Sequence, residues 1–174
     1  MGRVLSLLLG PEFNRLFHEF EYTAFRLETR DRYNAPREAE AFRQFVAGEP
    51  VELGWRTTWL RMVRDAARAG RRFKRVRVVS VPLTDYCRFA VFCSGQANAA
   101  GEDIRYLQRD EAEGLPDHDY WLFDSHKLVR MHFDDDDVML GGEVINDPAE
   151  IVRANHWRDV AWHRAWLRET FVSR

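Results

Sequence analysis

The first half of the chain shows the spacing of amphipathic helices, with apolar residues three or four positions apart. Three helices are predicted, over residues 11–20, 36–47 and 55–69. Gly48 and Gly70 are expected to end the second and third helices, and Asn34 is expected to cap the second. Residues 22–29 alternate apolar and polar side chains, so we expect a strand with one face open to solvent.

The middle of the chain has the pattern of a parallel strand pair. Residues 75–80 (Arg-Val-Arg-Val-Val-Ser) are predicted to form a strand, a helix is predicted from Thr84 or Asp85 to about residue 99, and residues 103–107 form a second strand. Strand, helix and strand within about 33 residues is the spacing of a βαβ crossover, which is right-handed.

Three further strands and a long helix follow a polar loop. The strands are predicted at residues 119–124, 127–133 and 138–145. Their short links indicate antiparallel hairpins, with a bulge or bend at Gly141-Gly142. A helix is expected from Pro148 to about residue 171. The pattern therefore predicts one mixed α+β (α/β) domain over residues 1–174, with helices packed on a single mixed sheet.

Composition narrows the class of protein. The chain is 45% hydrophobic and 31% charged, with a net charge of −2, as expected for a globular protein without a general affinity for nucleic acid or anionic membrane. No apolar run is long enough for a membrane span, and Val4 to Leu9 is too short for a signal peptide. Cys87 and Cys93 are expected to be unpaired thiols, so we expect a cytoplasmic protein. Met1-Gly2 with Ser6 matches the loose myristoylation pattern.

A ligand site is expected at the carboxyl edge of the parallel strands, where open α/β sheets bind ligands. Arginine would hold an anion bidentately there, while aspartate would orient the anion or pair with the arginine. The candidate ligand-binding residues are Arg26, Glu28, Thr84, Asp85, Arg105, Arg109, Asp124 and His132. Two simpler interpretations stay open: Thr84 or Asp85 is an ordinary helix cap, or the charged groups form a structural ion-pair network.

Metal and nucleophile motifs are weak. The acidic run of residues 134–137 beside His132 lacks the spacing of a calcium loop and is interpreted as a charged hairpin turn. His156, Asp159 and His163 share a helix face, for which a solvent-exposed polar surface is the favoured interpretation. We predict no cofactor, no metal and no catalytic residue, because nucleophile turns and glycine-rich phosphate loops are absent from the sequence.

A basic cluster spans residues 68–77, at the end of one predicted helix and the start of a strand. A single aromatic residue, Phe73, lies among its cations, so the stacking platforms of single-strand binders are missing. A solvated face is favoured over nucleic-acid contact, which would predict steep salt dependence.

Several sequence blocks resemble an uncharacterised family of actinobacterial domains often encoded beside helix-turn-helix regulators. The matching blocks are Thr23-Ala-Phe-Arg-Leu-Glu28 with Tyr33, Arg75-Val-Arg-Val-Val-Ser80 with Pro82-Leu-Thr-Asp-Tyr86, Gly101-Glu-Asp-Ile-Arg-Tyr-Leu107, and Pro116-Asp-His-Asp-Tyr-Trp-Leu-Phe-Asp124 with Met131-His-Phe-Asp134. The resemblance implies a bacterial cytoplasmic regulatory protein. The chain departs from the family pattern at Ala90, where an acidic residue is usual, which argues against an acidic site on that helix.

The strand order also resembles half of a phospholipase D-like domain, although the catalytic motif of those enzymes is not present: His126 and Lys127 are adjacent. The leading hypothesis is a non-catalytic sensor or interaction domain in a regulatory or conflict pathway. Its expected partner is a small anionic ligand or a helix-turn-helix regulator. The alternative is a phosphoesterase or nuclease with His132, Asp124 and Asp85 as acid and base groups.

Overall fold

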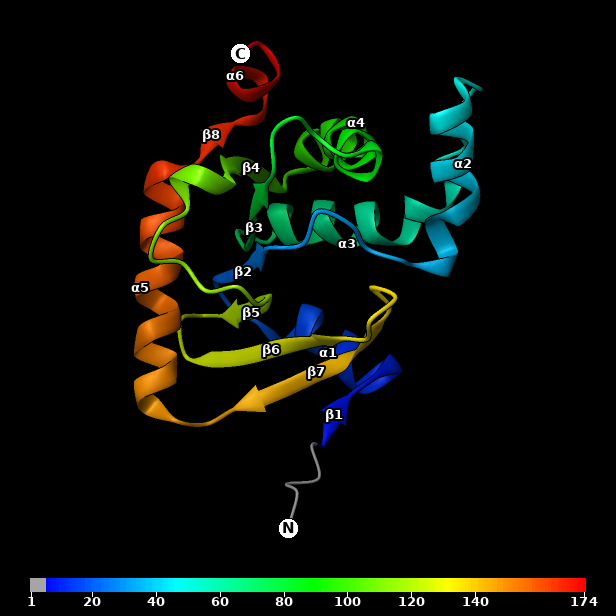
Figure 1. The fold of residues 1–174 in the computed structure, drawn as a ribbon. Coiled ribbons are helices and arrows are strands. Elements are labelled where there is room, and N and C mark those ends of the chain that lie inside the picture. The colour runs from blue at the N-terminus through cyan, green and yellow to red at the C-terminus, as the bar shows by residue number, and fades with distance from the viewer. Residues whose placement is uncertain (1–5) are drawn as a thin grey trace.

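The fold is organised around one mixed sheet, which a computed structural model describes over residues 6–174 (Figure 1). Within that range the strands are β1 (Leu7–Leu8), β2 (Thr23–Glu28), β3 (Arg72–Val79), β4 (Asp103–Gln108), β5 (Tyr120–Phe123), β6 (Lys127–Phe133), β7 (Met139–Ile145) and β8 (Trp166–Leu167). The helices are α1 (Gly10–Glu19), α2 (Ala39–Ala47), α3 (Thr57–Arg68), α4 (Asp85–Ala100), α5 (Pro148–Arg164) and α6 (Arg168–Val172).

The sheet has a parallel centre and antiparallel flanks, in the order β1-β7-β6-β5-β2-β3-β4-β8. Strand β3 pairs in parallel with both β2 and β4, and α4 connects β3 to β4. Strands β5, β6 and β7 form antiparallel hairpins, and β5 runs antiparallel to β2. The mixed α+β class, the parallel pair around the middle helix and the hairpins are therefore confirmed.

Helices cover both faces of the sheet. One face packs against α1, α3, α4 and α6, in a core that includes Phe17, Val63, Phe73 and Phe171. The other face packs against α5, which stands alone along one side of the sheet in Figure 1 and buries Ala154. We call these the inner face and the α5 face. A third apolar cluster, which includes Phe89, joins α2 to α4.

Strand β2 lies between β3 and β5, and this position overturns the prediction that residues 22–29 have a solvent-exposed face. Ala24 to Glu28 are all buried, including Arg26 and Glu28, which are each 6% exposed. The alternating pattern was interpreted as one wet face, but a central parallel strand is covered on both sides. Its polar side chains are consequently enclosed between the sheet and the helices.

Most predicted helix ends are confirmed by backbone geometry. Gly48 ends α2 in the left-handed conformation, with φ 69°, and the Thr84 hydroxyl caps α4 by accepting a hydrogen bond from the Cys87 N–H. The cap predicted at Asn34 is wrong. A short 3-10 turn, Pro36–Glu38, precedes α2, and the Asn34 amide instead donates to the backbone oxygen of Asp136.

The long C-terminal helix predicted to about residue 171 is interrupted. Helix α5 ends at Arg164, and the two-residue strand β8 pairs with the outer edge of β4 before α6 begins. Pairing that edge satisfies backbone groups that a continuous helix would leave open. Phe171 of α6 then stacks on Tyr106, with ring centroids 4.9 Å apart.

The predicted irregularity at Gly141-Gly142 is confirmed by a register shift opposite His132 and Phe133. A Cβ added at Gly142 would lie 2.6 Å from a methyl carbon of Val129, so the close packing of β7 on the core requires glycine there. Across residues 6–174, no helix combines the length and apolar character needed to cross a membrane. The myristoylation pattern begins at Gly2, which lies outside the described residues.

Candidate functional site

Four charged side chains from neighbouring parallel strands meet on the inner face of the sheet. The β2–β3 register places Arg26 opposite Arg75 and Glu28 opposite Arg77. Alternate residues of a strand share one face, so all four point toward the same side. We call Arg26, Arg75 and Arg77, gathered around Glu28, the arginine cluster.

Glu28 is the centre of this cluster. Its Oε1 accepts a hydrogen bond from Arg75 Nη1 at 2.5 Å, and its Oε2 lies 2.8 Å from Arg77 Nε. Arg26 Nε lies 3.9 Å from Oε1. Burial by itself would raise the pKa of Glu28, but the charges of Arg77, Arg75 and Arg26 outweigh it and hold the pKa at about 2. Glu28 is therefore an anion at any physiological pH.

Two further carboxylates neutralise Arg75 and Arg26 from the sides. Glu102, which follows α4, accepts from Arg75 Nε at 2.9 Å and from Trp59 Nε1 at 3.1 Å. Asp119, which precedes β5, accepts from Arg26 Nη2 at 2.8 Å and from Tyr33 Oη at 2.6 Å. Both of these arginines are thus held by carboxylates on two sides.

Arg77 differs from its two neighbours because Glu28 is the sole carboxylate that pairs with it among residues 6–174. Its terminal nitrogens donate no hydrogen bond to any described residue, and its side chain is 16% exposed. Burial alone would lower the pKa of Arg77, but Glu28, followed by the phenol groups of Tyr106, Tyr86 and Tyr33, raises it well above the usual value. Arg77 is accordingly a permanent cation with unused donors.

Glu38 and three tyrosines line the surroundings of Arg77. Tyr86 Oη donates to Glu38 at 2.7 Å, and the rings of Tyr33 and Tyr86 lie 5.8 Å apart. Burial is the main cause that raises the pKa of Glu38. Tyr106 Oη donates to Ser94 on α4 at 2.8 Å. The surroundings of Arg77 are therefore aromatic, with phenol hydroxyl groups.

Buried polar atoms without hydrogen-bond partners concentrate in this region. Arg26 Nε, Glu28 Oε2 and Arg77 Nε are all such atoms; although Arg77 Nε and Glu28 Oε2 are an ion pair, the N–H is not aligned for a hydrogen bond. Trp55 Nε1, in the adjacent α2–α4 cluster, is another. Buried polar atoms are nearly always paired. This concentration therefore indicates polar groups whose hydrogen-bonding partner is not among the described residues.

The carboxyl edge of the parallel strands, where the sequence places the ligand site, is closed by Arg109. Its Nε donates to Ser80 Oγ at 3.0 Å, and its Nη2 donates to the backbone oxygen of Thr29 at 2.8 Å and lies 3.2 Å from Asp31 Oδ2. These acceptors come from the ends of β2 and β3, so Arg109 fastens neighbouring strands together. The structural ion-pair interpretation describes this residue.

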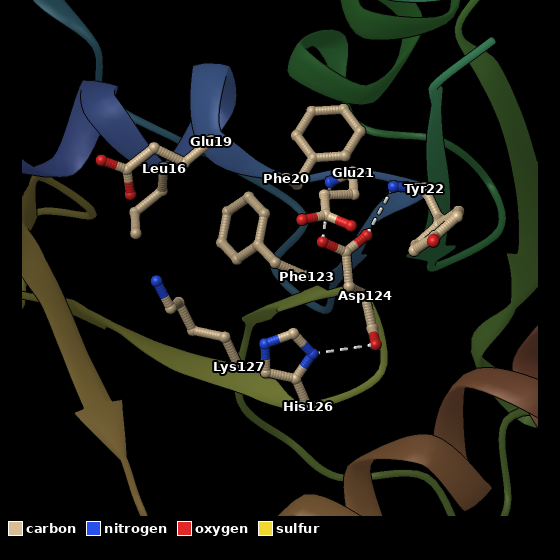
Figure 2. A pocket seen from close by; sticks show the side chains of 9 residues that line it. All are labelled: Leu16, Glu19, Phe20, Glu21, Tyr22, Phe123, Asp124, His126 and Lys127. Carbon is tan, nitrogen blue, oxygen red and sulfur yellow. Dashed lines mark hydrogen bonds between the residues drawn. The ribbon is translucent and has the colours of Figure 1, made fainter.

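Asp124 lies at the opposite edge of the sheet, because β5 runs antiparallel to β2. Its carboxylate accepts from the backbone N–H groups of Glu21, Tyr22 and Thr23 at 2.7–2.9 Å, as Figure 2 shows for the first two. The expectation that Asp124 shares one edge with Arg109 is therefore wrong. Sequence order alone does not show in which direction a strand runs relative to its neighbour in the sheet.

The remaining candidates are also dispersed. Asp85 forms a surface ion pair with Arg88, Arg105 pairs with Asp103 on the α5 face, and Thr84 is the cap of α4. His132 Nε2 lies 3.0 Å from Glu143 Oε2, so it does have the carboxylate partner that an acid-base role needs.

The proposed acid and base groups nevertheless do not converge. His132 lies near the end of β6, roughly 17 Å along the strand from its start beside Asp124, at about 3.3 Å per residue. Asp85 lies on α4, on the inner face of the sheet. No group of three or more potential metal ligands is assembled among residues 6–174, and His156, Asp159 and His163 are exposed.

The basic cluster of residues 68–77 is divided by the sheet rather than forming one solvated face. Arg68 and Arg72 are exposed, whereas Arg75 and Arg77 enter the arginine cluster. The members that sequence reasoning missed are Arg75, Arg77, Glu102, Asp119 and Tyr33. The available signal was β3 itself: arginines alternating with valines in a strand predicted to be parallel, and hence covered on both faces, must be buried.

A mixed sheet with a parallel centre, helices on both faces and a buried arginine cluster defines an α+β domain with a charged interior. A family model of a domain of unknown function, DUF6879, matches residues 11–173. The match covers nearly the whole chain, and the chain belongs to this family. The prediction that the chain belongs to an uncharacterised family is therefore confirmed. A comparison with curated proteins found no match.

Proposed function

We propose that the chain is a non-catalytic sensor domain that binds a small anionic ligand through Arg77. The observation that carries the proposal is that both terminal nitrogens of Arg77 lack an acceptor among the described residues, while Arg26 and Arg75 are each held by carboxylates on two sides. The prediction of an anion held by arginine is kept, but its location moves from Arg109 to Arg77.

The charges around Arg77 favour an anion. Four guanidinium groups lie together here, Arg26, Arg56, Arg75 and Arg77. They face the carboxylates Glu28, Glu102 and Asp119, and a fourth carboxyl group, Glu38, whose pKa burial raises. Arg56 donates to the backbone oxygen of Cys93 and to Gln96 instead of to a carboxylate. Protonation of Glu38 would leave one positive charge uncompensated, and a buried charge without a partner is costly.

The geometry of the ligand follows from the donors. A guanidinium presents two parallel N–H groups to a carboxylate or phosphate, which gives a bidentate pair. The tyrosine rings beside Arg77 would contact the apolar part of a small organic anion. Glu38, whose pKa burial raises, would disfavour the anion when it is ionised and tolerate the anion when it is protonated.

The sensor role requires a partner that detects the bound state. The resemblance noted from the sequence blocks suggests a helix-turn-helix regulator, and we propose that such a regulator contacts the domain. The loop that carries Tyr33 would transmit the bound state to the β6–β7 hairpin. The two are connected by a hydrogen bond that Asn34 N–H donates to the backbone oxygen of Asp137. Co-purification of the domain with a helix-turn-helix regulator, with and without acetate, would test this.

The binding proposal is tested with acetate, the simplest probe with a carboxylate. Thermal unfolding is followed at constant ionic strength while sodium acetate replaces sodium chloride at pH 7. We expect a saturable rise in melting temperature for the wild-type protein. Arg77→Gln should abolish the rise, and Arg77→Lys should weaken it, since an ammonium group cannot form the bidentate pair.

The matched control is Arg64→Gln, an exposed arginine of α3. It should keep the full response. An equal response in the Arg77 and Arg64 variants, or no saturable response in the wild-type protein, would contradict binding at Arg77.

A further inference from the structure

A second cavity, on the α5 face, has the features of a phosphate site. It lies between β2, β3, α5 and the turn that joins β5 to β6, and has a volume of about 250 Å³. Pockets for drug-sized ligands start at roughly 300 Å³, so this cavity suits one small polar group. Its lining residues are Thr23, Phe25, Lys74, Ser125, Arg158, Asp159 and Trp162.

Lys74 is the main cation of this cavity. No carboxylate of the described residues forms an ion pair with it, and its ammonium group lies 5.0 Å from the centre of the Trp162 ring. Burying the lysine stem against the sheet and the indole leaves the charge at the cavity, where no described carboxylate is paired with it.

Arg158 supplies a second cation from α5. Its Nη1 donates to Ser125 Oγ at 2.6 Å, and its Nε lies 2.8 Å from Asp159 Oδ1. The side chain of Arg158 is 22% exposed, whereas that of Asp159 is 69% exposed and mostly solvated. The arginine is therefore held in place by the β5–β6 turn, with its charge only partly compensated.

The cavity in Figure 2 provides an internal comparison, because it has the same volume and the opposite charge. It is lined by the carboxylates of Glu19, Glu21 and Asp124, with Lys127 as the single permanent cation. The α5-face cavity has two permanent cations and one exposed carboxylate. Only the latter has the charge balance that attracts a dianion.

We propose that the α5-face cavity binds the phosphate group of a small phosphate monoester through Lys74 and Arg158, with the hydroxyl groups of Thr23 and Ser125 as further hydrogen-bonding groups. Cations paired with hydroxyl groups are the usual combination for phosphate. The proposal is independent of the proposed function, because the arginine cluster lies on the other face of the sheet.

Phosphate binding at Lys74 can be observed selectively, since Lys74 and Lys127 are the only lysines of the chain. Reductive methylation with ¹³C-formaldehyde keeps their charges and gives one NMR signal for each lysine, in addition to the α-amine. Inorganic phosphate and glycerol 3-phosphate are then titrated at constant ionic strength. We expect a saturable shift of the Lys74 signal, and no shift of the Lys127 signal.

Three variants complete the test. Lys74→Met assigns the Lys74 signal. Arg158→Gln should weaken binding at least about tenfold, as expected for a lost charge-assisted hydrogen bond. Arg77→Gln should leave the response of the Lys74 signal unchanged. Tighter binding of glycerol 3-phosphate than of inorganic phosphate would identify the monoester as the ligand class, and the reverse would overturn that assignment. Equal shifts of both lysines, an unaffected Arg158→Gln variant, or no shift at Lys74 would overturn the site.

Discussion

Glu28 and Arg77 are direct cross-strand partners in the parallel β2–β3 pair, and their side chains meet 2.8 Å apart under the inner-face helices. Their strands lie at the centre of the sheet, where both faces are covered. The pairing register of β2 and β3 therefore determines which charged side chains meet in the arginine cluster.

Replacing Glu28 by Gln should destabilise the fold strongly. The substitution leaves Arg75 and Arg77 buried with less negative charge, and breaking a buried ion pair from one side costs about 3–5 kcal/mol. Urea unfolding measures the change in the free energy of unfolding. The exposed Glu113→Gln variant is the control, and it should change stability by less than about 0.5 kcal/mol. A similarly small loss for Glu28→Gln would show that the cluster is solvated.

Acid should remove the stability that Glu28 contributes. Its pKa in the folded protein is about 2, below its ordinary value of 4.5, so the contribution is complete above about pH 5 and is lost as the pH falls toward 2. The free energy of unfolding should decrease over this window in the wild-type protein. Glu28→Gln should show a smaller slope over the same window; parallel slopes would contradict the lowered pKa.

Glu38 should behave in the opposite way. Burial raises its pKa, so the folded protein favours the protonated form, and this contribution is lost as the pH rises through the raised pKa. Glu38→Gln should therefore increase the melting temperature at pH 7, where each 1 kcal/mol gained corresponds to about 2–4 °C for a chain of this length. The gain should vanish at pH 4. The exposed Glu52→Gln variant should show no such pH-dependent gain.

Asp124 should act as a local stabiliser of the sheet edge. Asp124→Ala removes the acceptor of three backbone N–H groups and should cost about 1–3 kcal/mol. Asp124→Asn keeps one oxygen and tolerates the left-handed backbone, with φ 50°, so its loss should be smaller. Asp110→Ala, at an exposed position, is the control for urea unfolding. Equal stability of the Ala variant and wild type would contradict this role.

Local sequence signals predicted the elements well, because they depend on neighbouring residues. Helix ends at Gly48 and Thr84 follow from backbone strain and side-chain capping, which act within one turn. The end of α5 at Arg164 was missed because β8 is stabilised by pairing with β4, about 60 residues earlier in the chain.

The sequence identified some residues of the site but not their positions in the fold. Arg26 and Glu28 were singled out from the sequence, yet as members of a solvated face. Their burial depends on the insertion of β5 beside β2, which no local pattern encodes. The same insertion carries Asp119 to Arg26 and moves Asp124 away from Arg109.

Binding of an oxyanion at Arg77 can be located directly by diffraction from crystals grown with selenate. Anomalous scattering from selenium locates the anion without reference to its chemistry. We expect an anomalous peak at Arg77, with selenate oxygens within about 3 Å of its terminal nitrogens, and loss of that peak in Arg77→Gln crystals. Selenate peaks elsewhere with none at Arg77 would show that Arg77 is not an anion site.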